Sequence, residues 1–240
     1  MITLVIATRN SHKVAEIRSI LGGTFHLLSL SDFPDAPTFR EDADSFEGNA
    51  TKKAVGLAVW LTSFDPACWS RSFPDSSARG LIFVLADDSG LEVDALDGAP
   101  GVHSARFAAT ELGVGGNSPD AANNAKLLRQ LEQVPRASRT ARFKCVIALT
   151  EISRGAGQSD SAQAESDGLT RATRLFEGTC EGHIALWASG AGGFGYDPLF
   201  IPDGFNQSFA ELGEDTKNQI SHRARALSKL REALLMESSV

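Results

Sequence analysis

The pattern of hydrophobic and polar positions predicts that strands and helices alternate in the first part of the chain. An apolar, β-branched run from Ile2 to Ala7 is typical of a buried strand. Apolar residues then recur at helical spacing from Val14 to Leu21 and, as one stripe, from Phe46 to Leu61. Residues suited to helix ends flank both stripes: Asn10 or Ser11 and Ser45 as N-terminal caps, and Gly22 as the end of the first helix.

The middle of the chain predicts two strands joined by a polar turn, followed by a helix and a longer strand. Leu81 to Ala86 is short and apolar, and Leu91 to Ala95 alternates as a second strand. The intervening Asp87-Asp88-Ser89-Gly90 has the small polar residues of a turn. We expect a helix over Ala121 to Leu131, and a strand with one solvent-exposed face over Ala141 to Leu149.

The last third of the chain indicates further strands and a closing helix. Arg174 to Cys180 and His183 to Ala188 are expected to be antiparallel neighbours of the preceding strand. The glycine-rich stretch Gly190 to Asp197 follows, and apolar spacing predicts a helix over His222 to Met236. Because helices alternate with strands early and antiparallel strands dominate later, the sequence favours a mixed α/β fold.

We expect one domain over residues 1–240. Two segments, 62–80 and 154–170, fit no helix or strand; the first is rich in Ser, Pro and Arg, and the second in Ser, Gly, Ala and Gln. Loops of this length are usually either functional or disordered. We interpret both as flexible surface insertions, with an active-site lid as the alternative.

Composition narrows the class of protein. The 240-residue chain has a net charge of −7, which argues against coating of nucleic acid, because that binding depends on Lys and Arg replacing counterions. No apolar run approaches the ~18 residues that cross a bilayer. The N-terminus lacks a basic start and a small-residue cleavage site, so we expect a cytoplasmic protein. The cysteines, Cys68, Cys145 and Cys180, are expected to be free thiols.

The loop from Thr8 to Lys13 is a candidate phosphate site. It lies between a predicted strand and a predicted helix, where free backbone N–H groups and the positive end of the helix dipole attract phosphate. Thr8, Asn10 and Lys13 add side-chain donors. The loop lacks the glycines of a P-loop or a dinucleotide fingerprint. An ordinary capped helix start is the alternative interpretation.

The adjacent carboxylates of Asp87 and Asp88 are a candidate metal site. At the end of a buried strand they repel each other unless a cation lies beside them. Carboxylate oxygens suit Mg²⁺, which usually binds one or two carboxylates together with substrate phosphates. A solvated acidic turn is the alternative. A nearby acidic cluster offers a further ligand: Glu41, Asp42, Asp44 and Glu47.

Candidate contacts for a nucleoside lie towards the C-terminus. Gly190 to Asp197 combines four glycines with two aromatic residues, and glycines at this density let a backbone approach another group closely. Phe194 or Tyr196 is a candidate for stacking on a nucleobase, with burial in the core as the alternative. Three donors, placed by the pattern at the start of the last helix, offer phosphate binding or hydrogen bonds to a purine 6-oxo group: Lys217, His222 and Arg223.

Together these motifs resemble the inosine triphosphate pyrophosphatase family, whose members remove ITP, dITP and XTP. The resemblance extends from residue 2 to about residue 235 and rests on six segments in the family's order. The segments are Ala7 to Lys13, Ser45 to Ala50, Ala86 to Val93, Gly98 to Arg106, Gly192 to Pro198 and Ile220 to Arg223.

The resemblance implies a homodimer with an inosine triphosphatase-like fold, in which helices flank a mixed, elongated β-sheet and two lobes enclose a deep central cleft. It assigns the triphosphate to Thr8, Arg9, Asn10, Ser11, His12 and Lys13, with further phosphate contacts from Ser89 and Lys217. It assigns the nucleoside to Phe194, Gly195, Tyr196 and Asp197, and recognition of the base to His222 and Arg223.

The resemblance also assigns the catalytic and metal-binding residues. Asp88 matches the catalytic aspartate and is one ligand of Mg²⁺, Glu41 is the second ligand, and Asp87 assists. The acidic stretch around Glu41 departs from that of bacterial relatives, which leaves Glu47 as the alternative ligand.

The implied reaction is hydrolysis of aberrant purine nucleoside triphosphates to the monophosphate and pyrophosphate, which keeps them out of DNA and RNA. Donors from His222 and Arg223 would meet the 6-amino group of adenine unfavourably, so ATP is expected to be a poor substrate. Two alternatives stay open: a pyrophosphatase for other modified nucleotides, and a nucleotide-sensing module without turnover. We expect neither nucleic acid nor a membrane as a partner.

Overall fold

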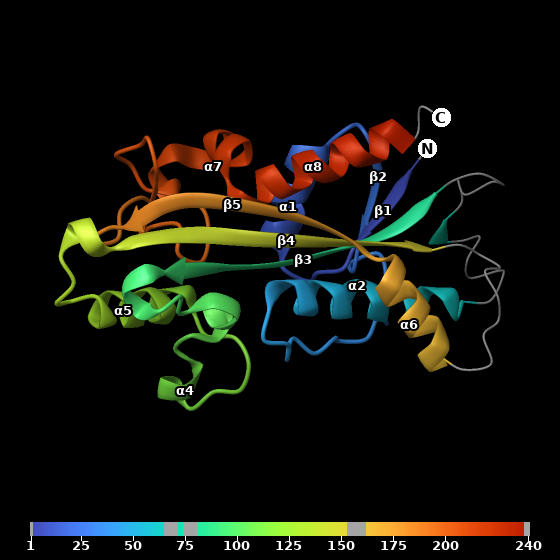
Figure 1. Cartoon of the computed structure of the whole chain (residues 1–240), viewed down its shortest axis with the longest axis horizontal. Coiled ribbons are helices and arrows are strands. Elements are labelled where there is room, and N and C mark those ends of the chain that lie inside the picture. Colours follow the sequence, from blue (N-terminus) through green and yellow to red (C-terminus); the bar gives the residue numbers. More distant parts are fainter. Residues whose placement is uncertain (1, 65–71, 74–80, 153–161, 238–240) are drawn as a thin grey trace. The chain divides into compact units, whose positions relative to one another are not determined.

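The computed structural model describes residues 2–64, 72–73, 81–152 and 162–237 (Figure 1). The strands are β1 (Thr3–Ile6), β2 (His26–Ser29), β3 (Ile82–Val93), β4 (Thr140–Ile152), β5 (Arg174–Ile184) and β6 (Phe200–Pro202). The α-helices are α1 (Ser11–Leu21), α2 (Phe46–Thr62), α4 (Ala109–Leu112), α5 (Asp120–Gln130), α6 (Ala162–Ala172), α7 (Phe209–Ile220) and α8 (His222–Glu237). Short 3-10 helices are η1 (Asp94–Leu96), η2 (Gly101–Arg106) and η3 (Arg136–Ser138).

The strands form one sheet in the order β2-β1-β3-β4-β5-β6. β1 pairs in parallel with β2 and β3, whereas β5 pairs with β6 in antiparallel orientation. Helices flank this sheet, so the mixed α/β fold expected from the sequence is confirmed. Within the described residues, no helix has the length and apolar character that crossing a bilayer requires.

The residues group into two compact units. The first contains Met1–Asp88 and Val146–Phe176, and the second contains Ser89–Cys145 and Glu177–Val240. The boundary falls within β3, β4 and β5, so each of these strands contributes residues to both units. The single domain expected over residues 1–240 stays a prediction.

In the first unit, β1 lies at the centre of the parallel strands. Leu4 of β1 lies opposite Leu27 of β2 and Phe83 of β3, and it is fully buried. The Asn10 side chain accepts the N–H groups at the start of α1, and the Ser45 side chain accepts one at the start of α2. The first strand and the first two helices predicted from the sequence are therefore confirmed.

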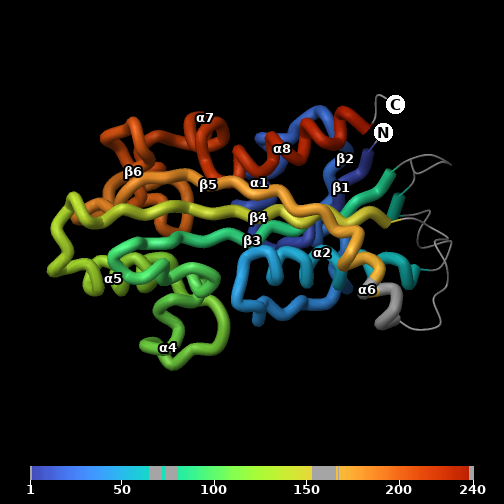
Figure 2. Tube along the Cα trace, in the orientation of Figure 1, coloured from blue at the N-terminus to red at the C-terminus, as the bar shows by residue number. Residues whose placement is uncertain are grey.

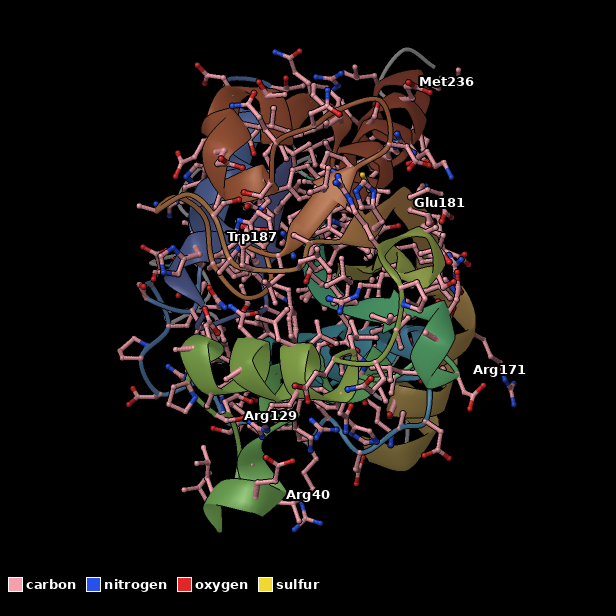
Figure 3. All side chains as sticks on the ribbon, turned by 90° about the vertical axis from the view of Figure 1, so that its left-hand side faces the viewer. Arg40, Arg129, Arg171, Glu181, Trp187 and Met236 are labelled. Carbon is pink, nitrogen blue, oxygen red and sulfur yellow. The ribbon has the colours of Figure 1, made fainter. Side chains whose placement is uncertain are left out.

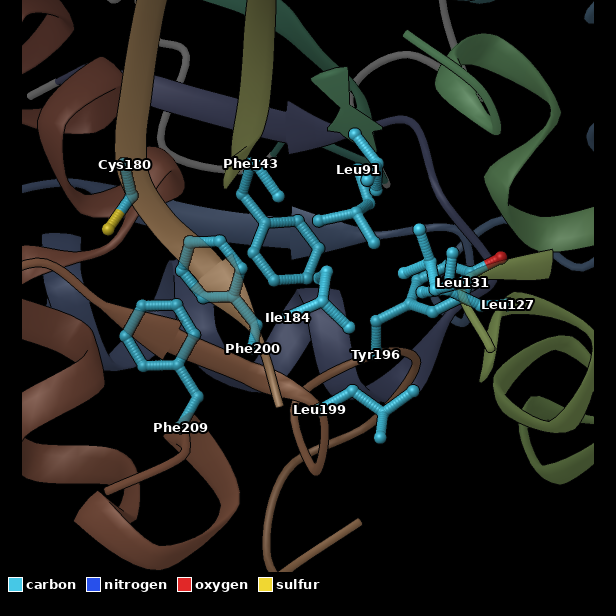
Figure 4. Close-up of a cluster of buried hydrophobic side chains, with 12 residues drawn as sticks. Leu91, Leu127, Leu131, Phe143, Cys180, Ile184, Tyr196, Leu199, Phe200 and Phe209 are labelled. Atoms are coloured by element: carbon cyan, nitrogen blue, oxygen red, sulfur yellow. The ribbon is translucent and has the colours of Figure 1, made fainter. Parts of the chain in front are cut away.

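In the second unit, a hydrophobic cluster joins the strands to the helices. Figure 4 shows Leu91 of β3, Phe143 of β4 and Ile184 of β5 in this cluster, together with Leu127 of α5 and Phe209 of α7. Figure 1 shows α5 on one side of these strands and α7 on the other. This packing buries the apolar face of each helix and so fixes the two helices on the sheet.

The predicted turn at Asp87-Asp88-Ser89-Gly90 is wrong. These residues continue β3 without interruption, and the strand ends at Val93, so that Ala95 belongs to η1. Turn preference is local, whereas strand formation also depends on pairing and burial in the sheet. The ion pairs described below stabilise the two carboxylates at this position, so the strand need not end there.

The other predicted strands require two corrections. Arg174 to Cys180 and His183 to Ala188 are not two strands, because β5 runs unbroken from Arg174 to Ile184. Gly182 within β5 allows the close approach of β6, since a Cβ atom there would lie 2.3 Å from the carbonyl oxygen of Ile201. The expected solvent-exposed face of β4 is also wrong for its centre, where every residue from Cys145 to Thr150 is buried.

Three α-helices lie where the sequence pattern predicted none: α4, α6 and α7. Part of segment 154–170 lies in α6, and α6 packs beside α2 (Figure 2). Residues 65–71, 74–80 and 153–161 lie outside the described residues. α7 precedes the final helix, so Lys217 belongs to α7 and not to the start of the last helix. Cys145 and Cys180 are buried free thiols as expected, and Cys68 lies outside the described residues.

Candidate functional site

The predicted phosphate loop from Thr8 to Lys13 follows β1, includes the first residues of α1 and is largely exposed. Asn10 Oδ1 accepts hydrogen bonds from the backbone N–H groups of His12 and Lys13, at 3.0 and 3.1 Å. The N–H of Asn10 donates to Thr8 Oγ1 at 3.2 Å, and the Arg9 guanidinium donates to the carbonyl oxygen of Ala36 at 2.6 Å. The loop therefore has a fixed shape at the positive end of a helix dipole, as an anion site requires.

Lys13 connects this loop to β3. Its ammonium group forms an ion pair with the carboxylate of Asp87, whose side chain is fully buried. The structure thus brings together the phosphate loop and the acidic pair, which are 74 positions apart in the sequence. The sequence predicts each of these groups as a candidate site from its own motif, and the ion pair joins the two.

Lys53 of α2 lies among three acidic residues. Its Nζ donates to the carbonyl oxygen of Asp87 at 2.7 Å, to Asp88 Oδ1 at 3.1 Å and to Glu41 Oε1 at 3.1 Å. Lys53 and Asp88 are buried, whereas the Glu41 side chain is 42% exposed. We call these five residues the carboxylate cluster: Lys13, Glu41, Lys53, Asp87 and Asp88.

Burial and charge act in opposite directions on the pKa values in this cluster. Burial raises the pKa of Asp88, and the nearby positive charges of Lys53 and Lys13 only partly counteract this, so the pKa stays above its usual value. Burial alone would lower the pKa of Lys53, but attraction to Asp88, Glu41 and Asp87 outweighs it and raises the pKa. Lys53 is therefore charged, and it stabilises negative charge on its neighbours.

The carboxylate cluster has the chemistry of a Mg²⁺ site. Asp88 Oδ2 is buried and has no hydrogen-bond partner in the described part of the chain. Glu41 and Asp88 bind the same ammonium group, so their carboxylates lie close enough to face one cation. Among the described residues, no group of three or more His, Cys, Asp or Glu side chains is arranged to hold a metal. Two carboxylates together with substrate phosphates nevertheless fit the ligands Mg²⁺ prefers.

The alternative ligand, Glu47, lies in different surroundings. It is on the first turn of α2 and lines a hollow of about 460 Å³ together with Lys52, Ser166 and Thr170. The geometry therefore favours Glu41 over Glu47 as the partner of Asp88.

A second set of expected site residues gathers in the second unit. The Lys217 ammonium group lies 4.5 Å from the centroid of the Phe194 ring and donates to Asp197 Oδ2 at 2.5 Å. Asp197 Oδ2 also accepts the backbone N–H of Phe194 at 2.8 Å. Lys217 and Asp197 are almost fully buried, whereas Phe194 is half-buried. Asp197 thus orders the backbone at Phe194 and holds a cation over its ring.

Two neighbouring donors on α8 complete this set. The Arg223 guanidinium is buried, lies 5.9 Å from the Phe194 ring centroid and donates to Ser89 Oγ at 3.3 Å. The His222 ring stacks on Phe143, with a centroid distance of 4.7 Å and an interplanar angle of 11°. We call six residues the aromatic cluster: Ser89, Phe194, Asp197, Lys217, His222 and Arg223.

Tyr196 has a different environment from Phe194. It is 4% exposed within the hydrophobic cluster of Figure 4, and its hydroxyl donates to the carbonyl oxygen of Ser104 at 2.9 Å. Of the two aromatic residues proposed for stacking on a base, the structure leaves Phe194 partly accessible and places Tyr196 in the core. Core burial, the alternative interpretation, therefore applies to Tyr196.

Lys53 is a site residue that was not predicted from the sequence. A signal for it exists, because Phe46, Ala50, Lys53 and Leu57 follow the spacing of the buried stripe of α2. A lysine within such a stripe needs a partner for its charge, and the acidic residues Glu41 and Asp88 provide it. Lys52, one position earlier, points away from this stripe and is exposed.

Comparisons with known proteins support one family. The family model described as "Ham1 family" matches residues 4–233. A dITP/XTP pyrophosphatase of Geobacter sulfurreducens is 46% identical over 235 residues, which cover 98% of this chain and 97% of that protein. One from Shouchella clausii is 41% identical over 231 residues, or 96% of each chain. The solved structure of a Ham1 protein from Coxiella burnetii has a TM-score of 0.71 at 32% identity, covering 98% of this chain and 100% of the other.

Proposed function

This chain belongs to the Ham1 family, and we propose that it is a nucleoside triphosphate pyrophosphatase that hydrolyses aberrant purine nucleotides such as ITP, dITP and XTP. The products are the nucleoside monophosphate and pyrophosphate. Relatives named dITP/XTP pyrophosphatase support the substrate class. The family resemblance inferred from the six sequence segments is confirmed.

The observation that carries the proposal is the environment of Asp88. Its Oδ1 atom is held by Lys53 at 3.1 Å, whereas its Oδ2 atom is buried and without a hydrogen-bond partner among the described residues. A buried acceptor without a partner is costly unless a ligand or a water molecule satisfies it.

In the proposed mechanism, Lys13 and Lys53 provide positive charge for the triphosphate, and Asp88 directs the attacking water. Asp88 Oδ2 accepts a proton from that water as its oxygen bonds to the α-phosphorus. The bond between the α-phosphorus and the bridging oxygen breaks, and pyrophosphate leaves. Lys53 fixes the orientation of the Asp88 carboxylate during this step, because it holds the other oxygen atom.

We include Mg²⁺ in the proposal, held by Glu41 and Asp88. The carboxylate cluster contains three carboxylates and two lysines, so without a further cation its net charge is unfavourable for an anionic substrate. When bound, Mg²⁺ would act as a Lewis acid on the phosphate oxygens.

We assign recognition of the purine to the aromatic cluster. The half-buried Phe194 ring offers a face for stacking, an interaction worth about 1–3 kcal/mol per base. Arg223 and His222 are the donors for a 6-oxo group, and adenine would leave such donors unpaired. Lys217 lies over the Phe194 ring, which supports a role near the nucleoside in addition to the phosphate contact expected from the sequence.

The test is pyrophosphate release from ITP, dITP, XTP, GTP, ATP and dTTP, with Mg²⁺ and after removal of metal by EDTA. Rapid turnover of ITP, dITP and XTP that requires Mg²⁺ is the expected result. Turnover mainly of other nucleotides would correct the substrate class. Binding of ITP without turnover of any triphosphate would instead indicate a nucleotide sensor.

The homodimer and the cytoplasmic location are further parts of the proposal. Both are supported by the resemblance to relatives named dITP/XTP pyrophosphatase. Light scattering coupled to size-exclusion chromatography measures the first, and cell fractionation the second.

A further inference from the structure

Gly195 lies between Phe194 and Tyr196 in the glycine-rich loop, and both of its backbone polar groups are held by α5. Its N–H donates to Asp120 Oδ2 at 2.6 Å, and its carbonyl oxygen accepts from Asn124 Nδ2 at 3.0 Å. Asp120 and Asn124 are four residues apart on α5, so both side chains lie on the same face of the helix. These two hydrogen bonds involve the N–H and the carbonyl oxygen of the same residue. They therefore determine the orientation of the peptide groups before and after Gly195.

The backbone of Gly195 depends on these two hydrogen bonds more than the backbones of Phe194 and Tyr196 do. Its φ angle is +63°, in the left-handed region where glycine is favoured, and glycine has the greatest backbone freedom. Tyr196 on one side is anchored by its buried hydroxyl, and the N–H of Phe194 on the other side is bound by Asp197. The remaining freedom lies at Gly195, and rotation there would move the Phe194 ring relative to Lys217.

The part of α5 that carries the two side chains is itself fixed. Between them in the sequence lies Asn123, which is 2% exposed. Its Oδ1 accepts from the N–H of Ala108 at 2.8 Å and from Ser118 Oγ at 2.9 Å, and its Nδ2 donates to the carbonyl oxygens of Ala105 and Ser118. The first turn of α5 is thereby tied to the chain that precedes it, so it provides a rigid support for the loop.

We infer that Asp120 and Asn124 are positioning residues, which hold Gly195 so that the Phe194 ring is presented to the purine in one orientation. Neither side chain needs to contact the substrate for this role. The inference rests on the proposed function, because it assumes that Phe194 stacks on the base. Loss of the restraint should weaken nucleoside binding and leave the phosphate chemistry nearly unchanged.

The experiment is a double-mutant cycle on the full chain, with ITP as substrate. Asp120→Ala is expected to raise KM about fivefold with kcat within about twofold, because a charge-assisted hydrogen bond is lost from the loop. In a Phe194→Ala background, the same substitution should change KM by less than about twofold, since no ring is left to orient. Asp120→Asn keeps an acceptor oxygen and should restore KM to within about twofold of the wild-type value.

Arg129→Ala is the matched control on the same helix. Arg129, labelled in Figure 3, forms an exposed ion pair with Glu111 at 2.6 Å, so its loss should leave KM within about twofold. Thermal unfolding is measured for every variant. If Asp120→Ala is unfolded at the assay temperature, Asn124→Ala replaces it in the cycle, with the same expected pattern in KM.

One outcome would contradict the positioning role, and another would contradict the proposed function. An equal rise in KM with and without the Phe194 ring would overturn the positioning role, because the effect would not pass through that ring. Absence of turnover in the wild type would contradict the proposed function instead. The cycle is then measured as binding of IMP by calorimetry, where coupling between Asp120 and Phe194 supports the inference and its absence overturns it.

Discussion

Each unit buries a lysine in its candidate site, but the two lysines have different surroundings. Lys53 in the first unit contacts oxygen atoms of Glu41, Asp87 and Asp88. Lys217 in the second unit is paired with Asp197 and lies 4.5 Å from the centroid of the Phe194 ring. The ammonium group of Lys53 therefore stabilises three acidic residues. The ammonium group of Lys217 pairs with one carboxylate and lies against an aromatic ring.

This difference indicates a division of tasks between the clusters. Carboxylates outnumber lysines in the carboxylate cluster, which suits a divalent cation and the phosphates it accompanies. In the aromatic cluster, Lys217 and Arg223 outnumber the single carboxylate of Asp197, which suits an electron-rich base with a 6-oxo acceptor. The two clusters should therefore respond differently to mutation, one in turnover and the other in nucleoside affinity.

The largest effect is expected from Asp88→Asn. The amide cannot accept the proton of the attacking water, so kcat for ITP should fall about 10³-fold, while binding of IMP changes little. Pyrophosphate release and calorimetry measure the two quantities. Asp42→Asn is the control, since Asp42 forms an exposed ion pair with Lys52. Near-normal turnover of Asp88→Asn would show that another group acts as the base.

Lys53→Met should mainly affect stability. Removing this charge leaves Asp88 and Asp87 buried without their shared donor, so the free energy of unfolding should fall by about 3 kcal/mol. Denaturant unfolding measures it, and Lys52→Met should change it by less than about 1 kcal/mol because its ion pair is exposed. Adding Asp88→Asn to Lys53→Met should recover part of the loss. If Lys52→Met and Lys53→Met lowered the free energy of unfolding equally, the buried contacts of Lys53 would not be the source of the stability.

Phe194→Ala tests whether the two clusters have different tasks. Loss of stacking should raise KM for ITP about tenfold, within the range for one base on an aromatic ring. Inhibition by inorganic tripolyphosphate, which has no base, should keep its wild-type constant. Weaker inhibition by tripolyphosphate would mean that Phe194 also supports the phosphate site, and the division of tasks would then be wrong.

The smallest effect is expected from Tyr196→Phe. This change removes the hydrogen bond from the tyrosine hydroxyl to the carbonyl oxygen of Ser104, so unfolding should become easier by about 1 kcal/mol. The KM for ITP should stay within about twofold, because Tyr196 is a core residue. A large rise in KM without a loss of stability would return Tyr196 to the group of substrate contacts.

Much of the fold was predictable where local chemistry decides the structure. Asn10 and Ser45 cap their helices through side-chain oxygens a few residues away, so their positions can be recognised from short segments. Strand β3 was predictable only in part, because its polar centre at Asp87 and Asp88 has the composition of a turn. Its continuation depends on neighbouring strands and on lysines from α1 and α2, which no local pattern includes.

The candidate site, like the fold, was predictable where short segments decide the structure, but not where residues distant in the sequence do. The sequence alone selected Asp88, Phe194 and the loop from Thr8 to Lys13, because their residue types and order resemble one enzyme family. Only the tertiary structure placed Lys53 beside Asp88, 35 positions away, and separated the core residue Tyr196 from the accessible Phe194. The physical reason is that burial and charge pairing depend on residues distant in the sequence, whereas helix caps and motifs depend on near neighbours.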